Sequence, residues 1–250
     1  MTSGPRVVRA GNASPMTLDG TRTFIVGERV PVVIDPGPDD PAHLAAIEEA
    51  LGGRAPAAIL LTHGHADHAA AAPALAARTG APVLGGAGHP LAGGDEVVGD
   101  GGTIRAVATP GHAPHHFAFL WTGGAAPARG ALFVGDLFMG QGDTTLVAWP
   151  EGDLADYLRS LDRVEALAPG ILYPAHGPPI ADPAEAVRRY RAHRVARIGQ
   201  VAEATRAAPG AVPAALVDRV YGAALHPAMR EAAEGSIRAI VEYLRCRRDG

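Results

Sequence analysis

Residues 58–68, AILLTHGHADH, constrain this chain more than any other stretch. They open with the apolar run 59–61, which is typical of a buried β-strand. Four candidate metal ligands follow within six residues: His63, His65, Asp67 and His68. Small residues between these ligands let the backbone turn tightly, and the four alanines that follow favour a helix. The segment is therefore predicted to be a strand, a loop of ligands and the start of a helix.

The chemistry of these side chains suits a catalytic metal site. Imidazole binds zinc and related metals, and carboxylate suits harder cations, so a mixed cluster fits a catalytic zinc centre. One histidine in such a place would more often cap a helix or lie on a solvated loop. Three histidines and an aspartate at this spacing, directly after a buried strand, favour a metal site.

Similar side chains follow three later predicted strands, residues 103–109, 131–134 and 171–173. The candidates after them are, in order, His112, His115 and His116, then Asp136, then His176. Each of these side chains taken alone could equally be an ordinary turn or loop residue. Their order and chemical type together favour one shared site.

Over about residues 16–180 the sequence resembles the metallo-β-lactamase superfamily. THGHADH is similar to its H-x-H-x-D-H signature, TPGHAPHH to its T-P-G-H element, and Gly135-Asp136 and His176-Gly177 to its G-D and H-G elements. The resemblance implies an α/β fold, a four-layer αββα sandwich with a metal site at one edge of its sheets. It also implies seven metal ligands: His63, His65, Asp67, His68, His112, Asp136 and His176.

The hypothesis for this site is two zinc ions per chain. The first ion would be held by His63, His65 and His112, and the second by Asp67, His68 and His176, with Asp136 bridging. Iron or manganese are alternatives, because histidine and carboxylate also suit these metals. Two metals about 3.5–4 Å apart can share a water and lower its pKa from near 16 to about 7. The resulting hydroxide would attack a carbonyl or phosphorus centre, and the expected catalytic carboxylates are Asp67 and Asp136.

Three further side chains are expected beside the ligands. Asp35 ends the predicted strand 30–34 in the turn IDPGP, where it would accept a hydrogen bond that orients a ligand loop. His116 would support the ligands rather than bind metal. Thr144 lies in the polar, glycine-containing stretch 137–150, which is predicted to be a loop or lid that contacts substrate. His115 is expected on the loop surface.

The composition indicates a folded domain outside the membrane. Of the 250 residues, 47% are hydrophobic, which supports a sizeable core. The single cysteine, Cys246, excludes an intramolecular disulfide. Residues 1–11 lack the apolar stretch of a signal peptide, so a cytoplasmic protein is expected. No apolar run approaches the roughly 20 residues of a membrane span.

Two parts are predicted: a catalytic domain, residues 1–183, and a helical appendage, residues 184–250. In the appendage YRAHR, VPAALVDRVYG and SIRAIVEYL resemble the C-terminal part of the lactamase-beta-2-like branch, which implies a small winged-helix-like module. By analogy such a module would bind nucleic acid. The simpler interpretation is that it packs against the domain or forms a homodimer.

Charge is divided unevenly between the two parts. All 22 basic residues are arginines. Residues 184–250 hold 12 of them against 7 acidic residues, a net charge of +5, and residues 1–183 hold 10 against 19, a net charge of −9. A basic segment can attract a polyanion, but this excess is also usual for a solvated helical face. The acidic body would repel a long nucleic acid.

These observations predict a binuclear zinc hydrolase that acts on a small ester or thioester, as in glyoxalase-II-like relatives. The alternative is a metal-dependent endoribonuclease of the lactamase-beta-2-like type, with RNA as its partner. A non-catalytic binding module is the third interpretation, and the complete ligand set argues against it. The absence of lysine argues against glutathione as substrate, because lysine contributes to glutathione binding in the thioesterases that the chain resembles.

Overall fold

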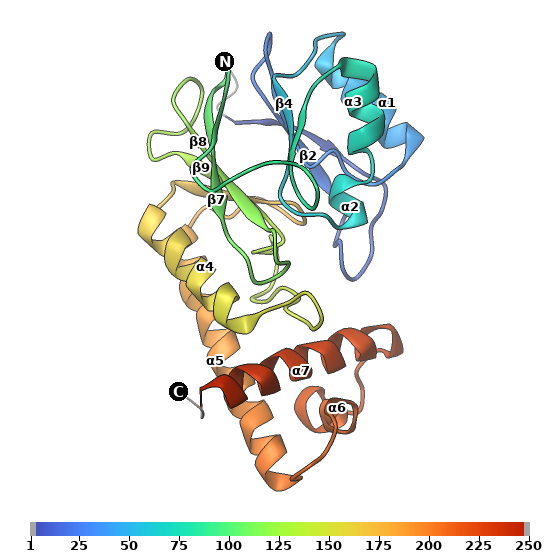
Figure 1. Ribbon diagram of the computed structural model, residues 1–250, viewed down its shortest axis with the longest axis vertical. Helices are drawn as coiled ribbons and strands as arrows, with labels where there is room; N and C mark the ends of the chain where they lie inside the picture. Colours follow the sequence, from blue (N-terminus) through green and yellow to red (C-terminus); the bar gives the residue numbers. More distant parts are fainter. Residues whose placement is uncertain (1–3, 248–250) are drawn as a thin grey trace.

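The computed structural model describes residues 4–247, so the first three and last three residues of the two predicted parts lie outside it. Within the described residues, ten strands form two five-stranded sheets that lie face to face. Helices cover the outer side of each sheet (Figure 1). This arrangement confirms the predicted αββα sandwich.

The first sheet has the strand order β1-β2-β3-β4-β5. Its strands are β1 (Arg6–Arg9), β2 (Arg22–Val26), β3 (Val32–Ile34), β4 (Ala58–Leu61) and β5 (Val83–Gly85). β3, β4 and β5 run parallel, so the residues that follow β3 and β4 emerge at the same edge. The helices between these strands are α1 (Pro41–Leu51), α2 (Ala66–Ala69) and α3 (Ala72–Thr79).

The second sheet has the order β10-β9-β8-β7-β6. Its strands are β6 (Glu96–Gly99), β7 (Gly102–Ala108), β8 (Phe117–Thr122), β9 (Ala131–Gly135) and β10 (Ile171–Pro174). β6 to β9 form an antiparallel meander, and β10 lies parallel to β9. The sequence analysis missed β6, because this short edge strand has no fully buried residue and therefore only a weak apolar pattern.

Alternating side chains of the strands supply two separate cores. One set fills the space between the sheets, where Phe24 and Val32 of the first sheet meet Phe119 and Phe133 of the second. The intervening residues of the first sheet, such as Ile59, pack outward against α1 and α3. Burial on both faces explains why these strands read as continuous apolar runs in the sequence.

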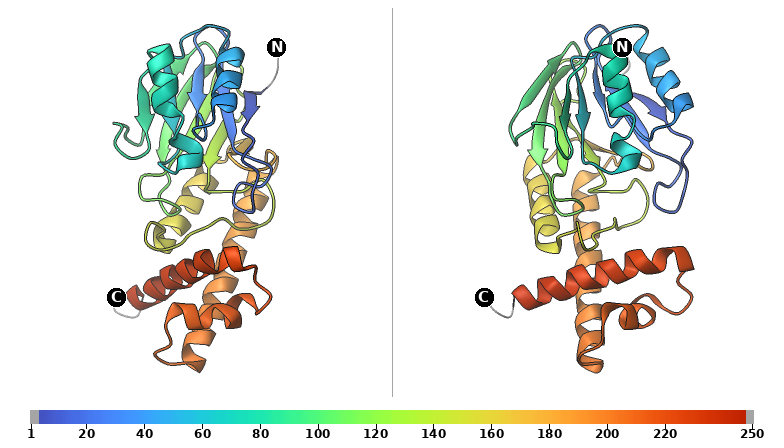
Figure 2. Two further views of the ribbon diagram at one scale, coloured as in Figure 1. Left: turned by 90° about the vertical axis from the view of Figure 1, so that its right-hand side faces the viewer. Right: turned by 45° about the vertical axis from the view of Figure 1, so that its right-hand side comes forward.

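The C-terminal helices lie below the sandwich, where α7 crosses α5 (Figure 2). They are α5 (Pro183–Ala207), α6 (Pro213–Tyr221), the short 3-10 turn η1 (Pro227–Met229) and α7 (Arg230–Cys246). One apolar cluster runs from the outer face of the second sheet through α4 (Leu154–Leu167) and α5 to α6 and α7. The domain boundary at residue 183 stays a prediction.

The appendage is helical, as predicted, over its described residues. Residues 184–247 contain no β-strand, so the paired wing strands of a winged helix are not found there. The link between α6 and α7, residues 222–229, contains the 3-10 turn η1 and no β-hairpin. Across residues 4–247, no helix combines the length and apolar character that crossing a bilayer requires.

Truncating Phe133 tests the inter-sheet core. Its ring lies 5.0 Å from that of Phe24 and 5.3 Å from that of Tyr173, measured between centroids. Phe133→Ala should lower the free energy of unfolding by about 3–5 kcal/mol, because it leaves a cavity among buried rings. Urea denaturation followed by circular dichroism measures this change. Val98→Ala is the control, since Val98 is 68% exposed, and equal losses in both variants would contradict the assigned core.

Candidate metal centre

The seven predicted ligands come together at one edge of the sandwich. β7, β9 and β10 run in the same direction, so the residues after them emerge at that edge. Two backbone hydrogen bonds join the sheets there: Phe117 donates to Thr62 O at 2.7 Å, and Arg22 donates to Ala175 O at 2.8 Å. The loop after β4 therefore faces the loops of the second sheet. The side chains gathered are His63, His65, Asp67, His68, His112, Asp136 and His176.

The first group of ligand atoms belongs to His63, His65, His112 and Asp136, and they all lie within 4.8 Å of one another. His65 Nδ1 is 2.9 Å from His63 Nε2 and 3.1 Å from His112 Nε2. Asp136 Oδ2 lies 3.6 Å from His112 Nε2. Three imidazole nitrogens and one carboxylate oxygen thus converge on one point.

Hydrogen bonds on the far side of two rings fix their protons. His112 Nδ1 is 2.7 Å from the carbonyl oxygen of Leu146, which can only accept, so Nδ1 carries the proton. His65 Nε2 is 2.9 Å from a carboxylate oxygen of Glu151 and likewise carries a proton. In the neutral rings, His112 Nε2 and His65 Nδ1 therefore present lone pairs to each other. No hydrogen bond can form between these two nitrogens, because neither carries a proton, but a cation between them would stabilise the contact.

The second group belongs to Asp67, His68 and His176. His176 Nε2 lies 3.3 Å from Asp67 Oδ2 and 3.2 Å from Asp136 Oδ1, and His68 Nε2 lies 3.3 Å from the same Asp136 oxygen. Nevertheless the buried Nε2 atoms of His68 and His176 and Oδ1 of Asp136 have no hydrogen-bond partner among the described residues. Asp136 therefore presents Oδ2 to the first group and Oδ1 to the second.

These donor sets fit metal ions. Ligand atoms about 2.0–2.1 Å from a tetrahedral zinc ion would lie about 3.3–3.4 Å apart. The shortest separations among these atoms, between 2.9 and 3.6 Å, are of this size, and all the atoms of each group lie within 4.8 Å of one another. Histidine nitrogen and carboxylate oxygen also suit iron and manganese.

The charges of the second group reinforce one another. Burial alone would raise the pKa of Asp136, but His68 and His176 hold it well below its ordinary value. Burial alone would lower the pKa of both histidines, but Asp136 and the other nearby carboxylates raise it, to about 9 for His176. These two protons supply positive charge between the carboxylates, and a metal cation would displace them.

Asp35 supports the ligand loop from beneath. It is 1% exposed; Oδ1 accepts the Thr62 N–H at 2.7 Å, and Oδ2 accepts the Thr62 hydroxyl at 2.7 Å. Oδ2 also lies 2.9 Å from His68 Nδ1, and the Thr62 hydroxyl lies 3.1 Å from His63 Nδ1. Contacts at Nδ1 leave Nε2 of both histidines free to face the centre. The sequence analysis expected this kind of role for Asp35.

His116 lies behind the ligands and does not reach the cavity. Burial, followed by the charge of His112, lowers its pKa to about 3, so its ring is neutral. Nδ1 is 2.9 Å from the Thr109 hydroxyl, and Nε2 accepts the backbone N–H of Asp136 at 3.3 Å. Gly135 has a φ of +47°, and a Cβ there would lie 2.8 Å from His116 Nε2, so glycine is required. His115 is exposed, as predicted.

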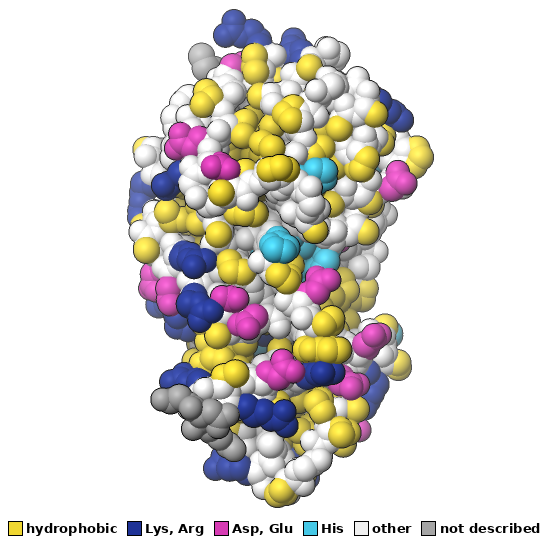
Figure 3. Space-filling model, in the orientation of Figure 1, with side chains coloured by type: hydrophobic (Ala, Val, Ile, Leu, Met, Phe, Trp, Pro, Cys, Tyr) yellow, Lys and Arg dark blue, Asp and Glu magenta, His cyan; other side chains and the backbone are white. Residues whose placement is uncertain are grey.

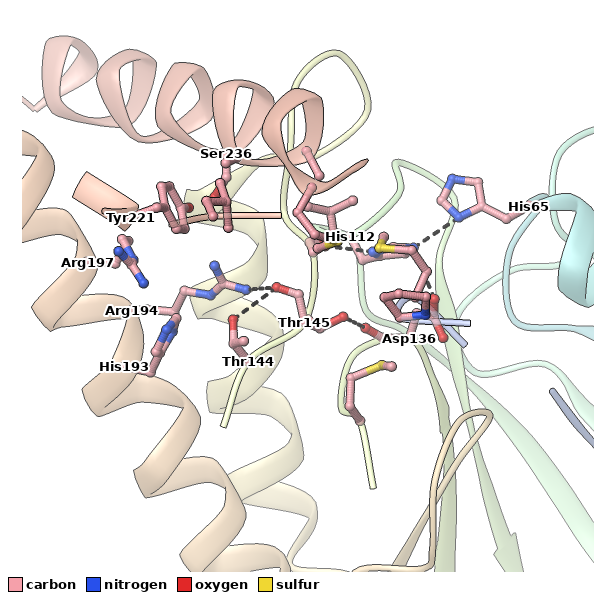
Figure 4. Close-up of a pocket in the computed structure, with 18 of the residues that line it drawn as sticks. His65, His112, Asp136, Thr144, Thr145, His193, Arg194, Arg197, Tyr221 and Ser236 are labelled. Carbon is pink, nitrogen blue, oxygen red and sulfur yellow. Dashed lines mark hydrogen bonds and ion pairs between the residues drawn. The ribbon is translucent and has the colours of Figure 1, made fainter. Parts of the chain in front are cut away.

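A cavity of about 310 Å³ opens above the centre. In the space-filling view, histidine side chains reach the surface between the sandwich and the C-terminal helices (Figure 3). His65, His112 and Asp136 lie at one end of the cavity, and side chains of α5, α6 and α7 lie at the other (Figure 4). Thr144, predicted to contact substrate, lines the wall between them.

Sequence reasoning missed two kinds of residue at this site. Glu151, which holds His65, lies 86 positions from it in the chain. His193, Arg194 and Arg197 line the cavity from α5. Only the helical spacing of these three residues, which puts them on neighbouring faces, could have indicated a shared role.

Comparisons with known proteins identify the family. The sequence profile of the Metallo-beta-lactamase superfamily matches residues 17–92. Lactamase-like protein adaB of Aspergillus niger is 32% identical over 242 residues, which cover 92% of this chain and 73% of that protein. Beta-lactamase-like protein 2 homolog of Drosophila melanogaster is 30% identical over 80% of this chain and 73% of its own length. Lactamase-like protein aptB of Emericella nidulans is 36% identical, and the chain spans 64% of its length.

Solved structures agree with this. The metallo-beta-lactamase family protein TTHA1429 from Thermus thermophilus has the same fold, with a TM-score of 0.79 at 22% identity over 98% of this chain and 94% of that chain. The protein TTHA1623, solved in a di-iron-bound form, is 28% identical, with a TM-score of 0.54 over 71% of this chain and 93% of its own.

The chain belongs to the metallo-β-lactamase superfamily, whose members are typically metal-dependent hydrolases. Its relatives place it in the branch of the beta-lactamase-like protein 2 homologues. The protein is therefore a hydrolase of this superfamily with a metal-binding site at the edge of its sandwich.

Asp35→Asn should weaken metal binding by about 10- to 100-fold, the usual cost of losing a side chain that orients ligands. The asparagine amide would turn an NH2 group toward the Thr62 hydroxyl or His68 Nδ1, which are donors. Competition with a chromophoric zinc chelator measures the affinity. Asp39→Asn is the matched control, because Asp39 is exposed on the same turn. Equal affinities for both variants would show that Asp35 does not position the ligands.

Proposed function

We propose that the protein is a binuclear zinc hydrolase that cleaves a small ester or thioester. The observation that carries this proposal is the cavity, whose volume of about 310 Å³ is at the lower end of the range for small-molecule sites. The C-terminal helices close the cavity opposite the metal ligands, with apolar side chains such as Leu225 and Met229 in its wall. A small acyl compound fits these dimensions and this lining.

Each residue of the site would have a separate role. His63, His65 and His112 would hold one ion, Asp67, His68 and His176 the second, with Asp136 between them. When bound, the two cations would polarise an acyl carbonyl and acidify a water molecule. Asp67 lines the cavity, and its carboxylate would orient the attacking water. Thr144 and Thr145 would border the acyl group.

Endoribonuclease activity is the alternative, and the net charge of −9 over residues 1–183 argues against it, because an acidic body would repel a long nucleic acid. In the appendage some of the basic charge is also neutralised: Arg188 pairs with Glu185, Arg191 with Asp162 and Glu165, and Arg230 with Asp218. Acidic and basic side chains alternate over the C-terminal helices on the face shown in Figure 3. A surface that binds RNA through its phosphates needs an excess of free positive charge. We therefore propose that the appendage packs over the site and does not bind RNA. We also propose that the enzyme is cytoplasmic and is a monomer or homodimer.

Metal content and paired turnover assays test this function. We expect about two zinc ions per chain and cleavage of acyl thioesters that a chelator abolishes and added zinc restores. Cleavage of single-stranded RNA without thioester cleavage would instead support the endoribonuclease.

His63→Ala should lower the amount of bound zinc and reduce kcat/KM by more than about 100-fold. Loss of a side chain that only supports the ligands costs up to about 100-fold, so loss of a ligand should cost more. Metal analysis by mass spectrometry and thioester kinetics measure both effects. His89→Ala is the control, because His89 is exposed and is not one of the side chains that gather at the centre. Full retention of both zinc ions in His63→Ala would contradict the assigned ligands.

A further inference from the structure

The end of the cavity remote from the metal ligands is built from cationic and hydrogen-bonding side chains. His193, Arg194 and Arg197 project into it from α5, while Tyr221 and Ser236 border it from α6 and α7 (Figure 4). The carboxylates in the cavity wall, Asp67 and Asp136, lie at the opposite end with the metal ligands. The cavity is therefore electrically polarised along its length.

Arg194 is a buried cation without a counter-charge. It is 3% exposed, and its guanidinium lies 4.9 Å from the centre of the Tyr157 ring. Its hydrogen bond among the described residues goes to the carbonyl oxygen of Thr145, and its buried Nε has no partner there. No carboxylate of residues 4–247 lies within 4.0 Å of its nitrogens. A buried charge left unpaired in this way is costly, so an anionic ligand would stabilise it.

Arg197 and His193 lie beside Arg194 on α5 and are half-buried. Arg197 stacks on Tyr221 at 4.1 Å from the ring centre and donates to the carbonyl oxygen of Val220 at 2.8 Å. It too has no carboxylate within 4.0 Å among the described residues. His193 Nδ1 is buried and lacks a hydrogen-bond partner in the described part of the chain. Burial and the two arginines lower the pKa of His193 despite the nearby Asp143, so its ring is neutral.

The wall between the two ends is mainly apolar. Leu225, Met229, Ala232 and Ala233 line it from the side of α7. A ligand that spans the cavity would place one end at the metal centre, a short aliphatic stretch against this wall and the other end at the arginines. Arginine presents a planar fork of donors that matches the oxygens of a carboxylate or phosphate.

We propose that Arg194, Arg197 and His193 form a subsite for an anionic group at the remote end of the substrate, so that the esters or thioesters cleaved here are negatively charged acyl compounds. This inference rests on the proposed hydrolase function and narrows its substrate class. Arginine would bind a carboxylate and a phosphate in the same way, and the test below distinguishes the two groups.

Three acyl thioesters of N-acetylcysteamine differ only in their remote group: glutaryl with a carboxylate, 4-phosphonobutanoyl with a phosphonate, and 5-methylhexanoyl with an isopropyl group of similar shape. Wild-type enzyme should show kcat/KM for one of the anionic thioesters at least about tenfold above that for the neutral one, because a site built for a polar group rejects an analogue that lacks it. The preferred anion identifies carboxylate or phosphate as the group bound.

In Arg197→Met this preference ratio should fall to near one, while Arg188→Met should keep it. Arg188 lies on the same helix but is exposed and paired with Glu185. The ratio is the readout because partial unfolding or metal loss lowers both rates equally. Arg194→Met is a second variant with the same expected loss. A wild-type ratio near one, or an unchanged ratio in both Arg194→Met and Arg197→Met, would overturn the subsite.

If no thioester is cleaved, the proposed reaction is wrong, and binding then tests the subsite on its own. Isothermal titration of zinc-loaded protein with glutarate, 4-phosphonobutanoate and 5-methylhexanoate compares acids that each offer one carboxylate to the metal centre. A difference in affinity therefore reports the remote group. At least about tenfold tighter binding of an anionic acid, lost in Arg197→Met, would support the subsite. Equal affinities would refute it.

Discussion

Ligand lone pairs that face one another at the edge of the sandwich are the constraint on which this structure depends. His65 Nδ1 and His112 Nε2 lie 3.1 Å apart, while partners on the far side of each ring hold the protons. Such an arrangement is unfavourable unless a cation lies between the nitrogens. The fold must therefore hold side chains from four strand ends in positions that they would otherwise avoid. Cross-links between the two sheets meet this requirement, since Phe117 and Arg22 donate backbone hydrogen bonds to the opposite loops.

The supporting shell is as specific as the ligands themselves. Asp35 adopts a left-handed backbone conformation with a φ of +49°, which aspartate tolerates better than most residues. From there one buried carboxylate fixes Thr62 and, through Nδ1, His68. Gly135 lets β9 turn close beneath Thr62 and His116, so that Asp136 reaches both groups of ligands. Loss of any one of these contacts is expected to weaken metal binding, because the ligands lose the partners that orient them.

The C-terminal helices make the metal centre one end of a cavity. Their contacts run through the loop between β9 and α4: Arg194 donates to Thr145 O, and Trp149 donates to Gly235 O at 3.1 Å. Leu146 of this same loop holds His112. Helices that form the remote wall thus also steady a metal ligand. The remote wall of the cavity and the metal ligands at its other end are in this way parts of one packed structure.

The sequence alone predicted the sandwich and the seven candidate ligands, because the type and order of its short motifs resemble those of the metallo-β-lactamase superfamily. It also indicated Asp35, which follows a predicted strand. It could not give β6, whose half-exposed residues leave only a weak pattern. Nor could it give Glu151 and the three cavity residues of α5, since their partners lie far away in the chain. The sequence also resembles a winged helix in this region, but residues 184–247 contain no wing strands. Local periodicity determines strands, helices and the residues at their ends. Only tertiary packing decides which remote side chains share a cavity and which buried charges are left without a partner.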